Sequence, residues 1–111
     1  MDRVLVLDNE RLHAEEIAEC LRSRNMEVTI CDTLRHAERM LRHCNTSVVL
    51  IVINVSDSRR PWGRIIRKLQ EVCFQHCSPN SPALLCVSRI QREPQFELYL
   101  EQAGARLVYE S

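Results

Sequence analysis

Hydrophobic and polar positions along this chain follow two alternating patterns, and the first is a set of five short apolar runs. The most apolar run, residues 48–53, consists only of Val, Ile and Leu. Continuous apolar character is typical of a strand that is covered on both faces, as in a parallel sheet. The predicted strands cover residues 4–7, 26–31, 48–53, 83–88 and 106–109.

Between these strands, apolar residues recur at the three- and four-residue spacing of amphipathic helices. The predicted helices cover residues 12–23, 34–41, 62–77 and 93–103. Asp32 or Thr33 is suited to cap the second helix. Asn25 and Gly104 are expected to end the first and fourth helices. In the first helix, the residues expected to face inward are Leu12, Ile17, Cys20 and Leu21.

The order of these elements predicts an α/β fold. Four strand–helix pairs followed by a fifth strand indicate a doubly wound, flavodoxin-like sheet of five parallel strands with helices on both faces. The 111 residues suffice for one domain with one core, so we expect a single domain over residues 1–111. The sequence leaves no residues for a fifth helix after the last strand.

Charge and hydropathy narrow the class of partner. Acidic and basic residues balance at 15 each, so no net field draws the domain to nucleic acid or to an anionic membrane. No apolar run reaches the roughly 18 residues of a membrane span, and the N-terminus lacks the form of a signal peptide. We therefore expect a cytoplasmic domain that contacts neither membrane nor nucleic acid directly. The six cysteines contain no CxxC pair and are expected to be free thiols without a metal.

Four short segments resemble the receiver domain of bacterial response regulators, and their order and spacing extend the resemblance over nearly the whole chain. They are residues 4–10 (VLVLDNE), 25–28 (NMEV), 82–85 (PALL) and 103–105 (AGA). The resemblance implies a site at the C-terminal ends of the strands, where doubly wound sheets bind ligands. In such receivers, two acids after the first strand and an aspartate ending the third hold Mg²⁺. A lysine after the fifth strand and a hydroxyl ending the fourth complete the site.

Several of the site residues that receivers carry are missing from this chain. Asp8 matches the first acid, but Asn9 replaces the second, and Glu10 is expected to point elsewhere. Ser88 matches the hydroxyl position, unless a shift of one residue puts Val87 there. The chain's one lysine lies inside the third predicted helix, so none is available after the fifth strand.

The phosphoacceptor position is also without an acid. Counting forward from the second helix gives Val52, and counting back from the third helix gives Asn54. Neither side chain forms a stable acyl phosphate as a carboxylate does. Asp57 is the nearest acid, but it follows these positions in the loop. At most, Asp8 is expected to bind Mg²⁺ weakly.

The fourth predicted helix carries an apolar arc that is broad for one buried stripe. Such an arc predicts either core packing alone or an interaction face that extends onto the fifth strand. The residues of this predicted face are Phe96, Tyr99, Leu100, Ala103, Leu107 and Tyr109. The four histidines are scattered and are expected to be solvated. A basic cluster between Arg59 and Lys68 is either a solvated surface or a site for anions.

These observations lead to one preferred function and two alternatives. The preferred hypothesis is a non-enzymatic pseudo-receiver without a cofactor, acting as a phosphorylation-independent interaction and dimerisation module in bacterial signalling or transcription control. It would form the N-terminal part of a longer regulator with a downstream output domain. The first alternative is an active receiver that uses a displaced acid such as Asp57. The second is an anion- or nucleotide-binding flavodoxin-like protein, although no glycine-rich phosphate loop is present.

Overall fold

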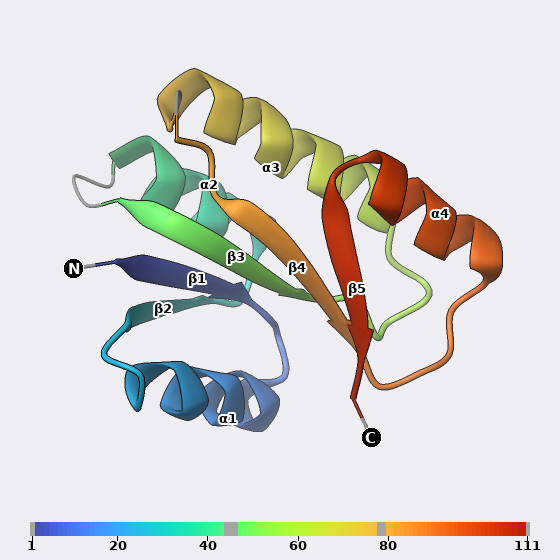
Figure 1. The fold of residues 1–111 in the computed structure, drawn as a ribbon, viewed down its shortest axis with the longest axis horizontal. Helices are drawn as coiled ribbons and strands as arrows, with labels where there is room; N and C mark the ends of the chain where they lie inside the picture. The colour runs from blue at the N-terminus through green and yellow to red at the C-terminus, as the bar shows by residue number, and fades with distance from the viewer. Residues whose placement is uncertain (1, 44–46, 78–79, 111) are drawn as a thin grey trace.

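Five parallel strands form one sheet in the order β2-β1-β3-β4-β5 in the computed structural model, which describes residues 2–43, 47–77 and 80–110 (Figure 1). The strands are β1 (Arg3–Leu7), β2 (Glu27–Cys31), β3 (Val48–Asn54), β4 (Ala83–Ser88) and β5 (Ala105–Tyr109). The helices are α1 (Arg11–Arg22), α2 (Leu34–His43), α3 (Trp62–His76) and α4 (Pro94–Gln102). The predicted doubly wound α/β fold is confirmed.

The register of the strands brings their C-terminal ends to one edge of the sheet. Leu7 at the end of β1 lies opposite Cys31 of β2 and Ile53 of β3. Ser88 at the end of β4 lies opposite Tyr109 of β5. Loops that are far apart in the sequence therefore meet at this edge.

Helices cover the two faces of the sheet unequally. α2, α3 and α4 lie on one side and α1 lies on the other (Figure 1). The larger core cluster, under α2, α3 and α4, contains Leu5, Ile51 and Leu69. The smaller cluster contains Val4 and Val52 together with residues of α1. α1 packs mainly on β2 and β1.

Local signals in the sequence explain where the helices begin and end. Asn25, which follows α1, has φ of 65°, and Gly104, which follows α4, has φ of 83°. Both adopt the left-handed conformation expected of helix stops. Of the two candidates for the cap of α2, Thr33 accepts a hydrogen bond at Oγ1 from the backbone N–H of His36 at 3.1 Å.

Two expectations about inward-facing residues are wrong. Leu12 is 82% exposed, and Cys20 is also exposed. The buried row of α1 is centred on Ala14 and Ala18, and the helical repeat of 3.6 residues puts Leu12 on the opposite side. Conversely, Leu100 of the predicted interaction face is fully buried in the core.

Most of the cysteines in the described residues are packed in the interior. Cys31, Cys73 and Cys86 are buried free thiols, and burial raises the pKa of Cys73 and Cys86 to about 12. Such thiols stay protonated and unreactive near neutral pH. Cys44 lies outside the described residues. No helix in the described residues is long and apolar enough to cross a membrane.

Candidate functional site

Asp8 and Glu10 form the base of a polar cluster at the C-terminal edge of the sheet. Asp8 directly follows β1 and is 3% exposed. Its Oδ1 accepts a hydrogen bond from the backbone N–H of Glu10 at 2.9 Å. This turn directs the Glu10 side chain back to the cluster, so the expectation that Glu10 points elsewhere is wrong.

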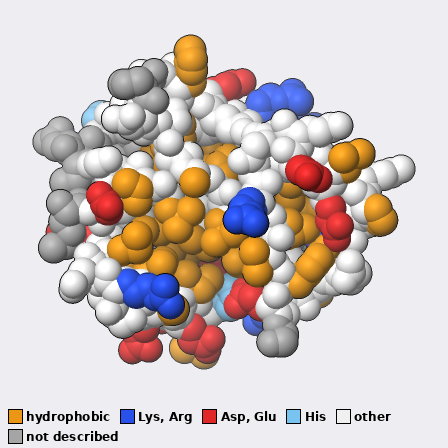
Figure 2. Space-filling model, in the orientation of Figure 1, with side chains coloured by type: hydrophobic (Ala, Val, Ile, Leu, Met, Phe, Trp, Pro, Cys, Tyr) orange, Lys and Arg blue, Asp and Glu red, His pale blue; other side chains and the backbone are white. Residues whose placement is uncertain are grey.

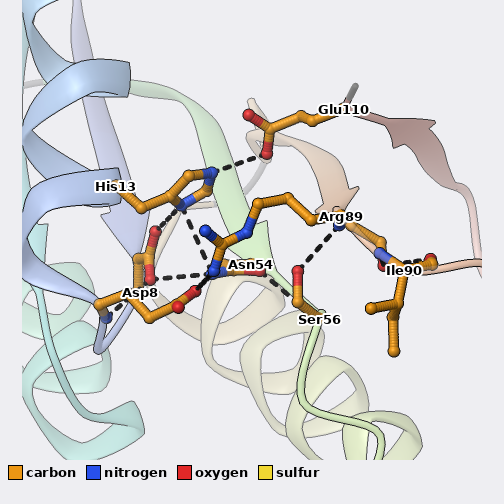
Figure 3. Close-up of polar contacts among 9 residues, drawn as sticks. Asp8, His13, Asn54, Ser56, Arg89, Ile90 and Glu110 are labelled. Carbon is orange, nitrogen blue, oxygen red and sulfur yellow. Dashed lines mark hydrogen bonds and ion pairs between the residues drawn. The ribbon is translucent and has the colours of Figure 1, made fainter.

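Asn54, the last residue of β3, joins these two acids. Its Nδ2 donates to Asp8 Oδ1 at 3.0 Å and to Glu10 Oε2 at 2.7 Å, and its Oδ1 accepts from the backbone N–H of Ser56 at 3.0 Å (Figure 3). Val52, the other candidate for this position, packs inside the smaller core cluster. Of the two, Asn54 therefore lies at the site and Val52 does not.

His13 is held between two carboxylates and is 7% exposed. Its Nδ1 lies against Asp8 Oδ2, and its Nε2 lies 2.7 Å from Glu110 Oε1 (Figure 3). Both ring nitrogens face carboxylate oxygens, an arrangement that favours the doubly protonated imidazolium. Burial by itself lowers the pKa of His13, but the hydrogen bonds to Asp8 and Glu110 raise the pKa above its ordinary value. The expectation of a solvated histidine is wrong here.

Arg89 supplies the second positive charge. Its guanidinium forms an ion pair with Glu10, and this hydrogen bond lowers the pKa of Glu10 below its ordinary value. The backbone N–H of Arg89 donates to Ser56 Oγ at 3.0 Å, which ties the loop after β4 to the loop after β3.

The cluster thus contains three carboxylates, Asp8, Glu10 and Glu110, and two cations, His13 and Arg89. Glu110 enters from the end of β5, where its backbone N–H donates to the carbonyl of Ser88 at 2.8 Å. A carboxylate therefore reaches the site from the strand that carries lysine in the receivers the sequence resembles. All buried side-chain nitrogen and oxygen atoms of the described residues have a hydrogen-bond partner.

The remaining predicted site residues lie at the margin. Ser88 is fully buried, and its Oγ donates to the carbonyl of Ile90 at 2.7 Å while accepting from the Ile90 N–H at 3.2 Å. The Ser88 hydroxyl therefore donates one hydrogen bond and accepts another within its own loop. Asn9 is exposed and lines an open pocket of about 660 Å³.

Asp57, Arg59, Arg60 and Trp62 line another part of this pocket. Asp57 pairs with Arg59 at 3.0 Å, and this contact lowers the pKa of Asp57 below its ordinary value. Trp62 is buried, donates from Nε1 to the Asp57 carbonyl at 2.7 Å, and has the Arg60 guanidinium 5.0 Å from its ring. The other members of the basic cluster, Arg64, Arg67 and Lys68, are exposed on α3 and do not line the pocket.

The donor set does not fit Mg²⁺. Asp8, Glu10 and His13 bring potential ligand atoms within 4.8 Å of one another. However, Asn54 and His13 already occupy the oxygens of Asp8, and Asn54 and Arg89 already occupy an oxygen of Glu10. Mg²⁺ requires near-octahedral oxygen coordination and does not coordinate imidazolium or guanidinium groups. The positive charge beside Asp8 and Glu10 comes from the side chains of His13 and Arg89.

Most residues of the predicted interaction face pack at least partly between α4 and the sheet. Phe96, Tyr99 and Leu107 are partly buried against the larger core cluster. Tyr99 donates from its hydroxyl to the Gly63 carbonyl at 3.2 Å. Ala103 is partly buried, and Tyr109 is 39% exposed with its hydroxyl in contact with Glu97. Leu100 is therefore a core residue, while the other five residues of this predicted face keep part of their surface exposed.

Solved structures of response regulators share this fold. A response regulator from Thermotoga maritima aligns over 99% of this chain and 85% of its own, with a TM-score of 0.78 and 16% identity. The receiver domain of a histidine kinase from Arabidopsis thaliana, in complex with Mg²⁺ and BeF₃⁻, aligns over 96% and 79%, with a TM-score of 0.76 and 17% identity. An orphan response regulator of H. pylori aligns over 97% and 81%, with a TM-score of 0.73 and 16% identity.

These likenesses establish the receiver fold. No family model and no curated protein matches the sequence.

Sequence reasoning missed His13, Arg89 and Glu110. The sequence did contain an indication of the role of His13. Asp8, Glu10 and His13 all lie within six residues after the predicted strand 4–7, in the loop and the first turn of the helix that follows. Arg89 and Glu110 each follow the end of a predicted strand, and the ends of parallel strands share one edge. Their pairing depends on side-chain directions that the local sequence does not specify.

Proposed function

We propose that this chain is a non-enzymatic pseudo-receiver, a signalling module that acts through protein contacts and without phosphorylation. The observation that carries the proposal is Asn54, whose amide stands at the end of β3 and donates to both Asp8 and Glu10. In the receivers that the sequence resembles, the phosphoacceptor attacks phosphorus with a carboxylate oxygen. An amide in this position acts as a hydrogen-bond donor to acids and has no such nucleophile.

The charge distribution supports the same conclusion. Phosphoryl transfer requires cations that are free to stabilise the negative charge of the incoming group. His13 and Arg89 are both engaged by carboxylates of the chain, and Glu110 adds a further negative charge. An incoming phosphoryl group would meet a site in which the positive charge is already neutralised.

A permanently satisfied site fits a domain whose conformation does not depend on a phosphorylation cycle. Such a module would regulate through constant or partner-dependent contacts, for example as the N-terminal part of a transcription regulator. The fold is shared with an orphan response regulator of H. pylori, which supports a role in signalling without naming a partner.

Intact-mass analysis after incubation with Mg²⁺ and acetyl phosphate tests the proposal. We expect no gain of the mass of one phosphoryl group, while an active receiver domain treated in parallel gains it. The matched variants are Asp57→Ala and Asp8→Asn. A stable adduct in the wild-type chain would refute phosphorylation independence.

The first alternative, an active receiver using Asp57, makes a different prediction in the same experiment. It requires an adduct that disappears in Asp57→Ala. Asp57 lines the pocket but is exposed in the loop and is paired with Arg59. Among the described residues, the side-chain contacts of Asp57 are with Arg59 and not with Asp8, Asn54 or His13, and this disfavours the alternative.

The second alternative, anion binding, is favoured by one observation. Three arginines, Arg59, Arg60 and Arg89, line the same pocket. Two of them are already ion-paired, so we expect inorganic phosphate to bind with a Kd in the millimolar range or weaker, about −4 kcal/mol. Calorimetric titration with phosphate that gives a micromolar Kd, lost in Arg60→Ala, would support the alternative instead.

A further inference from the structure

The contact between His13 and Glu110 joins two elements that pack on different parts of the sheet. α1 packs mainly on β2 and β1, whereas β5 is the strand at the opposite edge. α1 begins and β5 ends at the same end of the strands, and there His13 Nε2 lies 2.7 Å from Glu110 Oε1 (Figure 1 and Figure 3). This contact therefore connects the first helix to the end of the last strand.

The amide of Asn54 determines which nitrogen of the His13 ring keeps its proton. Asn54 Nδ2 lies 3.4 Å from His13 Nδ1, but its two hydrogens are donated to Asp8 Oδ1 at 3.0 Å and to Glu10 Oε2 at 2.7 Å. The amide has no hydrogen left for the ring. His13 Nδ1 therefore donates to Asp8 Oδ2 in both charge states of the ring, and a ring that loses one proton loses it from Nε2.

Loss of the Nε2 proton changes the contact with Glu110 and leaves the contact with Asp8 in place. A protonated Nε2 donates a charge-assisted hydrogen bond to the Glu110 carboxylate. Without that proton, Nε2 and Oε1 present lone pairs to each other at hydrogen-bond distance, and they repel. Asp8 still accepts from Nδ1, from the Glu10 N–H and from the amide of Asn54. Glu110 is therefore the partner that the neutral ring releases.

The charged groups around the ring favour its charged form. Asp8 and Glu10 approach from the loop after β1, Glu110 from the end of β5, and Arg89, which pairs with Glu10, from the loop after β4. Figure 2 shows acidic side chains along the lower rim of the molecule, where α1 and the end of β5 lie in Figure 1. Burial lowers the pKa of His13, but the hydrogen bonds to Asp8 and Glu110 raise the pKa above its ordinary value. The ring therefore stays charged at a pH at which a solvated histidine has lost its proton.

We propose that His13 is a pH-sensitive switch that holds Glu110, and with it the end of β5, against α1 when Nε2 is protonated, and releases Glu110 when Nε2 loses its proton. The Glu110 backbone N–H donates to the Ser88 carbonyl at 2.8 Å, so release of the side chain also loosens the end of the β4–β5 ladder. Because the Asp8 oxygens already accept N–H groups of the chain, the cation that is exchanged here is a proton and not a metal ion. The proton is then a signal that this domain reads without phosphoryl transfer.

An NMR titration of the chain tests this proposal from about pH 5 upward, across the range in which histidine titrates. Long-range proton–nitrogen correlations of the His13 ring should show both nitrogens protonated at low pH, and only Nδ1 protonated above the transition. Hydrogen-exchange protection of the Glu110 amide, corrected for the intrinsic effect of pH, should fall about tenfold through the same transition, because one charge-assisted hydrogen bond is lost. A neutral ring that keeps its proton on Nε2, or Glu110 protection that does not change with pH, overturns the proposal.

The variant Glu110→Gln identifies the partner that is released. It removes the negative charge but keeps hydrogen-bonding capacity, since a glutamine amide accepts from a protonated Nε2 and donates to an unprotonated one. We expect a lower pKa for His13, because one carboxylate that favours the imidazolium is gone, and protection at position 110 that no longer depends on pH.

Glu97→Gln is the matched control for this variant. The Glu97 carboxylate accepts from the Tyr109 hydroxyl near the same end of β5, whereas the carboxylates that contact His13 in the described residues are those of Asp8 and Glu110. The control should leave the titration of His13 unchanged. Equal effects of the two variants, or a pKa of His13 that Glu110→Gln does not lower, contradict the switch. The switch involves no phosphoryl transfer, so it stands or falls separately from the proposed function.

Discussion

The polar cluster at the ends of the strands and the α1 side of β5, which carries Arg106 and Val108, satisfy their charges in opposite ways. In the cluster, His13 and Arg89 each contact a carboxylate, and the amide of Asn54 binds two acids. On the α1 side of β5, Arg106 is exposed and forms no ion pair among the described residues, beside the half-exposed Val108. Both regions are built on the same sheet, and β5 contributes to both.

The difference indicates which charges the fold depends on. A buried ion that loses its partner destabilises the fold strongly, so the cluster must be completed by the chain itself. An exposed arginine without a partner contributes little to the stability of the fold. We therefore expect substitutions in the cluster to change stability far more than substitutions of exposed charges outside it.

The largest effect on stability is expected from His13→Ala. The variant leaves the buried carboxylate of Asp8 without its cation, which costs about 3–5 kcal/mol of the free energy of unfolding. Chemical denaturation monitored by circular dichroism measures this loss. His36→Ala is the control, because the His36 side chain is 38% exposed on α2 and its variant should lie within about 0.5 kcal/mol of the wild type. Equal losses in both variants would contradict the role assigned to His13.

A smaller loss is expected from Asn54→Asp, about 2 kcal/mol at neutral pH, because a third carboxylate then faces Asp8 and Glu10 without the amide donors. Mg²⁺ should recover part of this stability, since the new acid supplies oxygen ligands in place of N–H groups. Thermal unfolding with and without millimolar Mg²⁺ measures the recovery. We expect no comparable gain in the wild-type chain, and a similar gain there would show that its site does accept the metal.

The pH dependence of stability gives a third way to separate the two regions. Burial acts to lower the pKa of His13, but its hydrogen bonds raise the pKa above the ordinary value of a histidine, about 6.5. A raised folded-state pKa stabilises the fold fully below the unfolded pKa, and this contribution is lost as pH rises through the folded pKa. Denaturation between neutral and alkaline pH should therefore show stability falling as pH increases. The slope should disappear in His13→Ala and remain in Arg106→Glu.

The smallest effect on stability is expected for an exposed charge outside the cluster. Glu16→Arg should leave the free energy of unfolding within about 0.5 kcal/mol of the wild type, because Glu16 is exposed on α1 and forms no ion pair among the described residues. Chemical denaturation measures the difference. A loss as large as that of His13→Ala would contradict the distinction between the cluster and the exposed charges.

Several features of the fold could be predicted from the sequence because they depend on local pattern. The apolar runs gave the five strands, and the continuous run at 48–53 marked the central β3. Asn25 and Gly104 were identified as helix stops because few residues adopt positive φ without strain. The helical spacing of apolar residues also predicted α3, in which Ile65, Ile66 and Leu69 are buried.

The predictions from the sequence were incomplete where the local pattern allowed two interpretations. A broad apolar arc on α4 did not reveal that Leu100 is fully buried, because burial depends on which side of the helix meets the sheet. Leu107 and Tyr109 were expected to belong to an interaction face with the fourth helix. The alternation of β5 places both on the side of α4, where Leu107 packs against the larger core cluster and Tyr109 stays 39% exposed.

What the sequence by itself determined is the order and type of the elements, the edge of the sheet where polar residues gather, and the absence of an acid at both candidate phosphoacceptor positions. Those results follow from periodicity and from side-chain chemistry, which are local properties. Only the tertiary structure decided that Asn54 stands at the site while Val52 lies in the core, and that His13 and Arg89 neutralise acids from other segments. Residues 97 positions apart, such as His13 and Glu110, meet because parallel strands bring their ends to one edge, and no local pattern records that contact.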